Sequence, residues 1–178
     1  GQTILHRPRD HRSWQLGDGA RLAAETGIPV VNDFRQADIA SGGQGAPFAP
    51  LYHQALARGA GALLPMVVLN IGGVANVTYI GPDETLLAFD TGPGNAPIDD
   101  WMMKHLGEPM DRDGALAEKG VVNQDAVMQM LAHPYFVHPP PKSLDRADFS
   151  NDFVSGLSPE DAVATLAALT VLAIVRAT

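Results

Sequence analysis

The sequence lacks cysteine altogether and has few aromatic or positively charged residues. Its 178 residues include 12 Lys and Arg against 20 Asp and Glu, a formal net charge of −8. The absence of cysteine excludes disulfides, thiolate catalysis and thiolate zinc sites within this chain, and a reducing cytoplasm is the simplest setting. An acidic chain without a basic stripe also argues against a nucleic-acid or anionic-membrane partner.

Long apolar runs and metal-ligand patterns are missing as well. No apolar run reaches the roughly 18 residues that a bilayer span requires. The six histidines fall in no spacing typical of metal ligands, so we expect no resident metal site.

Strand-like and helix-like segments alternate along the chain, which favours an α/β architecture. We expect helices over 20–26, 51–59, 96–106, 113–120, 123–133 and 159–177. We expect strands over 29–34, 66–71, 75–80 and 84–90, the second and third forming a hairpin. A glycine-rich boundary over 57–65 divides the chain into residues 1–62 and 63–178.

The segment "NIGGVANVT" places a glycine pair between two strands. Gly72 and Gly73 let the backbone approach a ligand closely, and exposed N–H groups there suit phosphate oxygens. Asn70 adds a short polar side chain. The alternative is an ordinary hairpin turn with no ligand, because glycine patterns alone are weak indicators.

In "FDTGPGN" a carboxylate follows an apolar strand directly. We expect Asp90 at the end of that strand, where it would suit the role of general base. Thr91, Gly92 and Gly94 could surround an anion ahead of the next helix, whose N-terminus favours negative charge. In the alternative interpretation Asp90 caps that helix or a turn.

The segment "NDFRQADIASGGQGAP" repeats this arrangement. Asp33 follows the short apolar strand expected over 29–34, and the planar fork of Arg35 matches a carboxylate or phosphate. An internal Arg35–Asp38 ion pair that holds the loop is the alternative.

Taken together, several segments resemble the anhydro-N-acetylmuramic acid kinases over nearly the whole chain. They are "GQTILHRP", "GDGARLAAETGIPVVNDFRQADIASGGQGAPFAPLYHQAL", "LNIGGVANVTYI", "FDTGPGNAPIDDWM" and "DRDGALAEKGVVN". The resemblance implies an actin/hexokinase-like (ribonuclease H-like) kinase fold with two α/β lobes that close over ATP and sugar. Residues 1–62 would be the C-terminal part of the first lobe, ending in the crossing helix, and 63–178 the N-terminal part of the second.

The family's reaction is an ATP- and Mg²⁺-dependent phosphorylation. Water opens the 1,6-anhydro ring, O6 takes the γ-phosphoryl group, and the N-acetylmuramic acid 6-phosphate formed enters cell-wall recycling. The resemblance makes Asp90 the catalytic base and implies a homodimer. The implied sugar-binding residues are Gln2, Thr3, Asp33 and Arg35, with Asp33 also a second candidate base. The implied phosphate- or nucleotide-binding residues are Asn70, Gly72, Gly73, Thr91, Gly92, Gly94 and Asn95.

Two departures from the family pattern qualify these expectations. The family's first glycine-rich ATP loop and its closing adenosine-binding segment have no counterpart here, so we expect an internal fragment that is inactive alone. In addition, Leu144-Asp145-Arg146-Ala147 stand where Thr-Gly-Arg-Glu is commonest. A levoglucosan-type anhydrosugar kinase and a non-catalytic actin-like ATP-binding protein are the alternative functions.

Overall fold

A computed structural model describes residues 2–7, 10–83 and 85–177 of the chain. The chain forms two compact units, Gly1–Phe48 and Ala49–Thr178. Both contain helices and antiparallel strands, which confirms the mixed α/β class expected of part of an actin/hexokinase-like kinase.

The first unit consists of a hairpin and two short helices. Strands β1 (Gln2–Arg7) and β2 (Arg12–Leu16) pair antiparallel, and the sequence interpretation had not identified them. Helix α1 (Gly19–Thr26) begins and ends as predicted: the Asp18 carboxylate accepts a hydrogen bond from the Arg21 N–H, and Gly27 closes the helix with a φ of 68°. Helix α2 (Phe34–Ala40) follows.

The strand predicted over 29–34 is wrong. Residues 29–33 have no regular structure, and α2 occupies the start of the region expected to be a loop. A strand needs a neighbour for its backbone groups, whereas β1 and β2 pair only with each other among the described residues. Val31 is accordingly 77% exposed, whereas Ile39 on α2 is buried.

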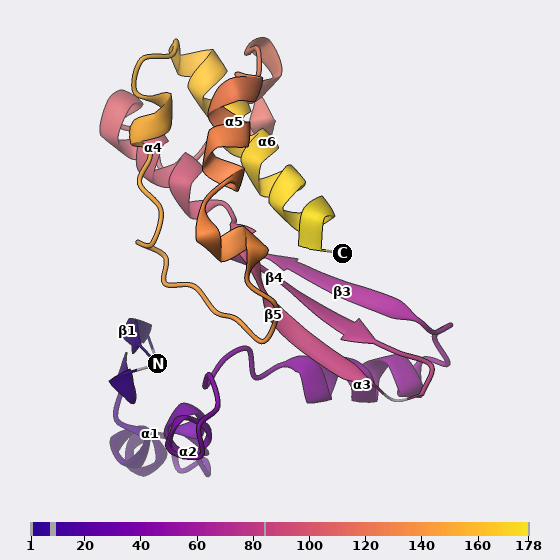
Figure 1. The fold of residues 1–178 in the computed structure, drawn as a ribbon. Coiled ribbons are helices and arrows are strands. Elements are labelled where there is room, and N and C mark those ends of the chain that lie inside the picture. Colours follow the sequence, from indigo (N-terminus) through magenta and orange to yellow (C-terminus); the bar gives the residue numbers. More distant parts are fainter. Residues whose placement is uncertain (1, 8–9, 84, 178) are drawn as a thin grey trace. The chain divides into compact units, whose positions relative to one another are not determined.

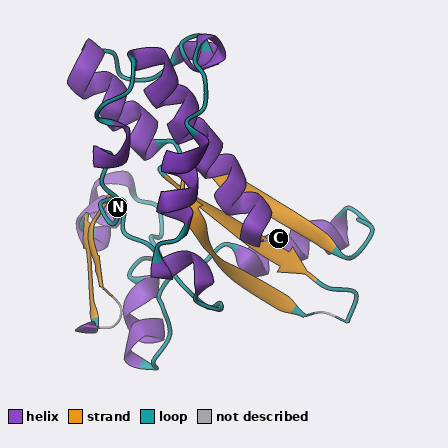
Figure 2. Cartoon of the chain, turned by 45° about the horizontal axis from the view of Figure 1, so that its top comes forward, coloured by secondary structure: helices purple, strands orange, loops and turns teal. Residues whose placement is uncertain are grey.

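The second unit contains the three-stranded sheet β3 (Met66–Ile71), β4 (Val74–Ile80) and β5 (Leu86–Pro93), in that order and antiparallel throughout. The predicted β3–β4 hairpin is therefore confirmed. Helix α3 (Pro50–Gly59) lies against one face, where His53 hydrogen-bonds Thr78 of β4 at 2.9 Å (Figure 1). Of the helices that follow β5, the last one packs on β4 and β5, and the two α-helices before it pack on that helix (Figure 2).

Helix α6 (Pro159–Ala177) organises that helical layer. It contributes to two buried clusters, one around Trp101 of α4 (Ala96–Leu106) and one around Leu131 of α5 (Gln124–Leu131). The remaining short 3₁₀ turns are η2 (Arg112–Gly114), η3 (Ala117–Lys119), η4 (Pro134–Val137) and η5 (Asp152–Val154). None of the helices within the described residues has the length and apolarity of a bilayer span.

The helix predicted over 113–120 is wrong, because the region contains only two 3₁₀ turns. Asp113 and Gly114 both have positive φ, which interrupts an α-helix. The Asp111 carboxylate instead accepts hydrogen bonds from the N–H groups of Leu116 and Ala117.

The compact units divide the chain between Phe48 and Ala49, and α3 packs on β4 and β5. These compact units do not test the assignment of residues 1–62 and 63–178 to two lobes of a larger enzyme, which stays a prediction.

Candidate functional site

Asp90 lies inside strand β5 rather than at its end. It pairs with Asn76, and the strand continues to Pro93. The prediction of a strand-end carboxylate was wrong because β5 continues pairing with β4 beyond Asp90. It does so across a β-bulge: Gly92 pairs with Ala75, which leaves Thr91 as the additional residue. Asp90 is 8% exposed.

One segment after α5 surrounds Asp90 with hydrogen bonds. The Leu144 N–H donates to Asp90 Oδ2 at 2.8 Å, and the Asp90 N–H donates to the Lys142 carbonyl at 3.1 Å. The Tyr135 hydroxyl donates to the Asp90 carbonyl at 2.6 Å. Figure 1 shows this segment, in orange, running beside β5. The carboxylate is therefore buried, anchored and oriented, as a catalytic base requires.

The aromatic and cationic groups of this segment have perturbed acidities. Burial, and then the charge of Asp90, raises the pKa of Tyr135 well above its ordinary value. Burial, and then the nearby Arg176, lowers the pKa of Lys142. The Lys142 ammonium lies 4.6 Å from the centre of the Tyr135 ring. Sequence reasoning had not selected Tyr135 or Arg176, because long-range packing rather than a local pattern brings them beside Lys142.

Lys142 and Arg176 also line a cavity of about 210 Å³, together with Phe89, Thr91 and Phe136. Arg146, on the same segment, does not line this cavity and forms an ion pair with Asp100 of α4.

The two glycine segments of the second unit are joined by hydrogen bonds. The N–H groups of Asn95 and Ala96 donate to the carbonyls of Gly72 and Gly73, and the Gly94 N–H also donates to Gly73. The Asn95 side chain donates to the Ile71 carbonyl at 3.2 Å. These hydrogen bonds therefore hold the β3–β4 turn directly against the start of α4.

Close packing explains two of these glycines. A Cβ on Gly94 would lie 2.2 Å from the Gly72 carbonyl oxygen. One on Gly92 would lie 2.9 Å from the Cβ of Ala173 on α6. Thr91 is buried, and its hydroxyl donates to the Ala75 carbonyl at 3.2 Å.

This geometry limits how the segment could hold a phosphate. The N–H groups of Gly94, Asn95 and Ala96 already donate within the chain, and Pro97 has none to offer. Asn70 lies on β3, opposite Asn76 of β4. The role of these residues as a phosphate cradle stays a prediction.

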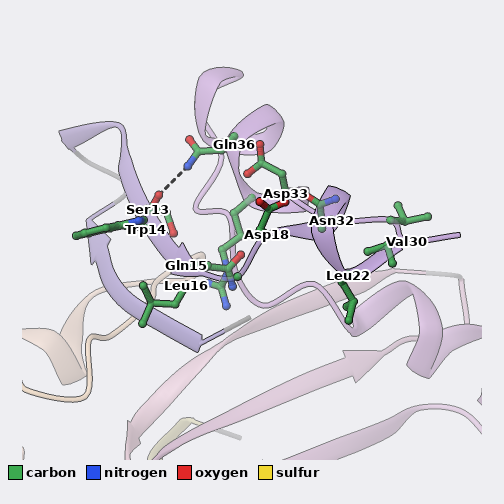
Figure 3. A pocket seen from close by; sticks show the side chains of 14 residues that line it. Ser13, Trp14, Gln15, Leu16, Asp18, Leu22, Val30, Asn32, Asp33 and Gln36 are labelled. Atoms are coloured by element: carbon green, nitrogen blue, oxygen red, sulfur yellow. Dashed lines mark hydrogen bonds between the residues drawn. The ribbon is translucent and has the colours of Figure 1, made fainter. Parts of the chain in front are cut away.

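In the first unit, Asp33 and Arg35 line one pocket of about 400 Å³. Asp33 immediately precedes α2, with a φ of 63° that is uncommon outside glycine. Figure 3 shows Asp33, Asp18 and Gln36 among the side chains that line the pocket. The other lining residues are Ser13, Trp14, Gln15, Leu16, Gly17, Gly19, Leu22, Val30, Val31 and Asn32, which sequence reasoning had not selected.

Hydrogen bonds tie the β1–β2 hairpin together and to α2. The Gln15 side chain donates to the Thr3 hydroxyl at 2.9 Å, and Gln36 donates to the Ser13 carbonyl at 2.7 Å. Thr3 thus touches a pocket-lining residue without lining the pocket itself. The backbone of Gln2 pairs with Leu16, but its side chain lies outside the described residues.

Asp38 organises the glycine loop that follows α2. Its Oδ2 accepts a hydrogen bond from the Gly45 N–H at 2.7 Å. A Cβ on Gly43 would lie 2.1 Å from the same carboxylate oxygen, so the loop backbone folds tightly over the Asp38 side chain.

The described residues contain no group of three or more His, Asp or Glu side chains placed to hold a metal ion.

Comparisons with known proteins place the chain beside one group of enzymes. The sequence pattern of the family described as anhydro-N-acetylmuramic acid kinase matches residues 1–178. Proteins named anhydro-N-acetylmuramic acid kinase are 57% identical in Paramagnetospirillum magneticum, 56% in Rhodospirillum rubrum and 55% in Methylobacterium nodulans. Each alignment covers 99% of this chain and 50%, 47% and 47% of the respective relative, so the chain spans about half their length.

Proposed function

The chain belongs to the anhydro-N-acetylmuramic acid kinase family, and on that basis we propose that the full-length protein is an ATP-dependent kinase of 1,6-anhydro-N-acetylmuramic acid. Its product would be N-acetylmuramic acid 6-phosphate, formed in the cytoplasm during cell-wall recycling. We propose further that the active protein is a homodimer, which light scattering would test.

In the proposed reaction Asp90 accepts a proton from water as the water oxygen attacks the anomeric carbon. The bond from that carbon to O6 breaks, and O6 attacks the γ-phosphorus of ATP while the bond to ADP breaks. Mg²⁺ would accompany ATP and neutralise phosphate charge. The observation that carries this role is the orientation of the buried Asp90 carboxylate by the Leu144 N–H.

The remaining roles follow the residues that the structure groups together. Asp33 and Arg35 share the 400 Å³ pocket, which supports a sugar-binding role, with Thr3 and Gln2 on the adjoining hairpin. The family membership is the basis for proposing a phosphate- and nucleotide-binding role for Asn70, Gly72, Gly73, Thr91, Gly92, Gly94 and Asn95. The hydrogen bonds between the two glycine segments would hold these residues in place rather than bind phosphate themselves.

A coupled assay of ADP release tests the proposal. The full-length protein would receive ATP, Mg²⁺ and either 1,6-anhydro-N-acetylmuramic acid or 1,6-anhydroglucose. We expect turnover of the muramic sugar alone. Turnover of 1,6-anhydroglucose alone would keep the proposed reaction but identify that sugar as the substrate. If neither sugar supports ADP release, the kinase assignment is refuted.

A further inference from the structure

Tyr135 hydrogen-bonds the backbone of Asp90 at a point where the pairing of β5 with β4 is irregular. Thr91 is the additional residue of the β-bulge, so the regular ladder to β4 is interrupted next to Asp90. On the other side of β5, the Tyr135 hydroxyl donates to the Asp90 carbonyl at 2.6 Å. This bond replaces the support that a neighbouring strand would give.

The Tyr135 ring is itself fixed on several sides. It packs edge-on against Phe136 and Phe149, with centroids 5.7 Å and 6.1 Å away. The Lys142 ammonium lies over the ring and also donates to the Tyr135 carbonyl at 3.1 Å. A hydroxyl on a ring held in this way has little freedom to leave its acceptor.

The direction of the hydrogen bond is also fixed. A backbone carbonyl accepts and cannot donate, so the phenol must keep its proton. Burial and the charge of Asp90 raise the pKa of Tyr135, which keeps the hydroxyl protonated well above neutral pH. Tyr135 is therefore a permanent donor rather than a group that exchanges protons with substrate.

The same segment orients the carboxylate. Leu144 donates its N–H to Asp90 Oδ2, and Lys142 accepts the Asp90 N–H. Movement of the Asp90 backbone would lengthen both bonds at once, because residues of one short segment make them.

We propose that Tyr135 is a positioning residue for Asp90, which fixes the direction of the base through its backbone carbonyl. The inference rests on the proposed function, in which Asp90 activates the water. In this role Tyr135 affects kcat but does not affect substrate binding.

The test compares Tyr135→Phe with Tyr79→Phe in the full-length protein. Tyr79 lies on β4 of the same sheet, and its hydroxyl has no hydrogen-bond partner among the described residues. For Tyr135→Phe we expect kcat to fall about tenfold, with the KM values for sugar and ATP unchanged, because misplacing a catalytic group slows chemistry rather than binding. Tyr79→Phe should match the wild type.

The melting temperature separates positioning from general destabilisation. Tyr135→Phe should lose kcat while it stays fully folded at the assay temperature and keeps the wild-type KM values, because the hydrogen bond that it lacks orients Asp90 rather than substrate. A folded Tyr135→Phe variant with the wild-type kcat would overturn the inference.

If Tyr135→Phe does not fold, Lys142→Met removes the ammonium that lies over the Tyr135 ring and should lower kcat in the same way but by less, again at unchanged KM. A wild-type kcat for that variant overturns the inference. A wild type without turnover on either sugar refutes the proposed function itself, and with it the inference.

Discussion

At the scale of single residues, Asp90 shows how one hydrogen bond can both stabilise a buried carboxylate and orient it. A carboxylate removed from water is stable only when donors replace the lost hydration. The Leu144 N–H supplies one such donor at Oδ2. The same bond that makes the buried side chain tolerable also gives it a single direction, which is what a base needs.

Gly94 provides a residue-scale test of the joined glycine segments. In Gly94→Ala the new Cβ would meet the Gly72 carbonyl oxygen at 2.2 Å. We expect a loss of about 1–3 kcal/mol in the free energy of unfolding, measured by denaturant titration, because overpacked sites must shift their backbone. Gly59→Ala is the matched control: nothing lies within 4 Å of its Cβ, so stability should stay unchanged or rise slightly. Equal stability of the two variants would contradict this account.

Arg35 provides the corresponding test of sugar binding. Arg35→Ala in the full-length protein should raise the KM for the anhydrosugar about 10- to 100-fold while kcat changes less, because a cation that contacts substrate contributes to binding. Arg21→Ala removes an exposed arginine that pairs with Glu25 and should leave both constants unchanged. If steady-state kinetics give the same KM for the wild type and Arg35→Ala, Arg35 has only a structural role.

At the scale of elements, Asp161 connects the start of α6 to the segment before α5. Its carboxylate accepts a hydrogen bond from the Val121 N–H at 2.7 Å. This bond, and then the neighbouring Ser158, lowers the pKa of Asp161 below its ordinary value of 3.8. Because the folded pKa is depressed, the stabilisation is complete above 3.8 and disappears as pH falls through the folded value.

Thermal unfolding between pH 6 and pH 2.5 tests this connection. The wild type should lose stability below pH 3.8 more steeply than Asp161→Asn, which lacks the titrating group. Glu160→Gln, in the same first turn, should follow the wild-type curve. Parallel curves for wild type and Asp161→Asn would contradict the assigned role.

Elements whose signals are local could be predicted from the sequence, and those that depend on pairing could not. Asp18 and Gly27 bound α1 as expected, and the Gly72–Gly73 turn joins the predicted hairpin. The strand predicted over 29–34 does not form, because no strand within the described part of the chain pairs with it. The position of Asp90 within β5 depends on a bulge, and its contacts come from the remote segment around Tyr135. No local pattern contains that information.

At the scale of the whole molecule, buried apolar packing is concentrated in the second unit. Both hydrophobic clusters lie within Ala49–Thr178. Among the described residues of the first unit, Ile39 is the only buried large hydrophobic side chain. Apolar burial therefore stabilises the second unit more than the first.

Hydrogen exchange of the 178-residue chain should reveal this difference. We expect amides of β4 and β5 to exchange far more slowly than those of β1 and β2, because opening the sheet exposes a core whereas opening the hairpin exposes little. Mass spectrometry of proteolytic peptides would measure both. Equal protection of the two regions would contradict the distribution of packing.

The central claim is that Asp90 is the base of an anhydrosugar kinase, and one measurement tests it most directly. The kcat of Asp90→Asn would be measured in the full-length protein with ATP, Mg²⁺ and 1,6-anhydro-N-acetylmuramic acid, beside Asp125→Asn, the same change at an exposed position of α5. We predict a loss of about 10²- to 10⁴-fold for Asp90→Asn at an unchanged melting temperature, and wild-type turnover for Asp125→Asn. Turnover of folded Asp90→Asn within a few-fold of the wild type would contradict the claim.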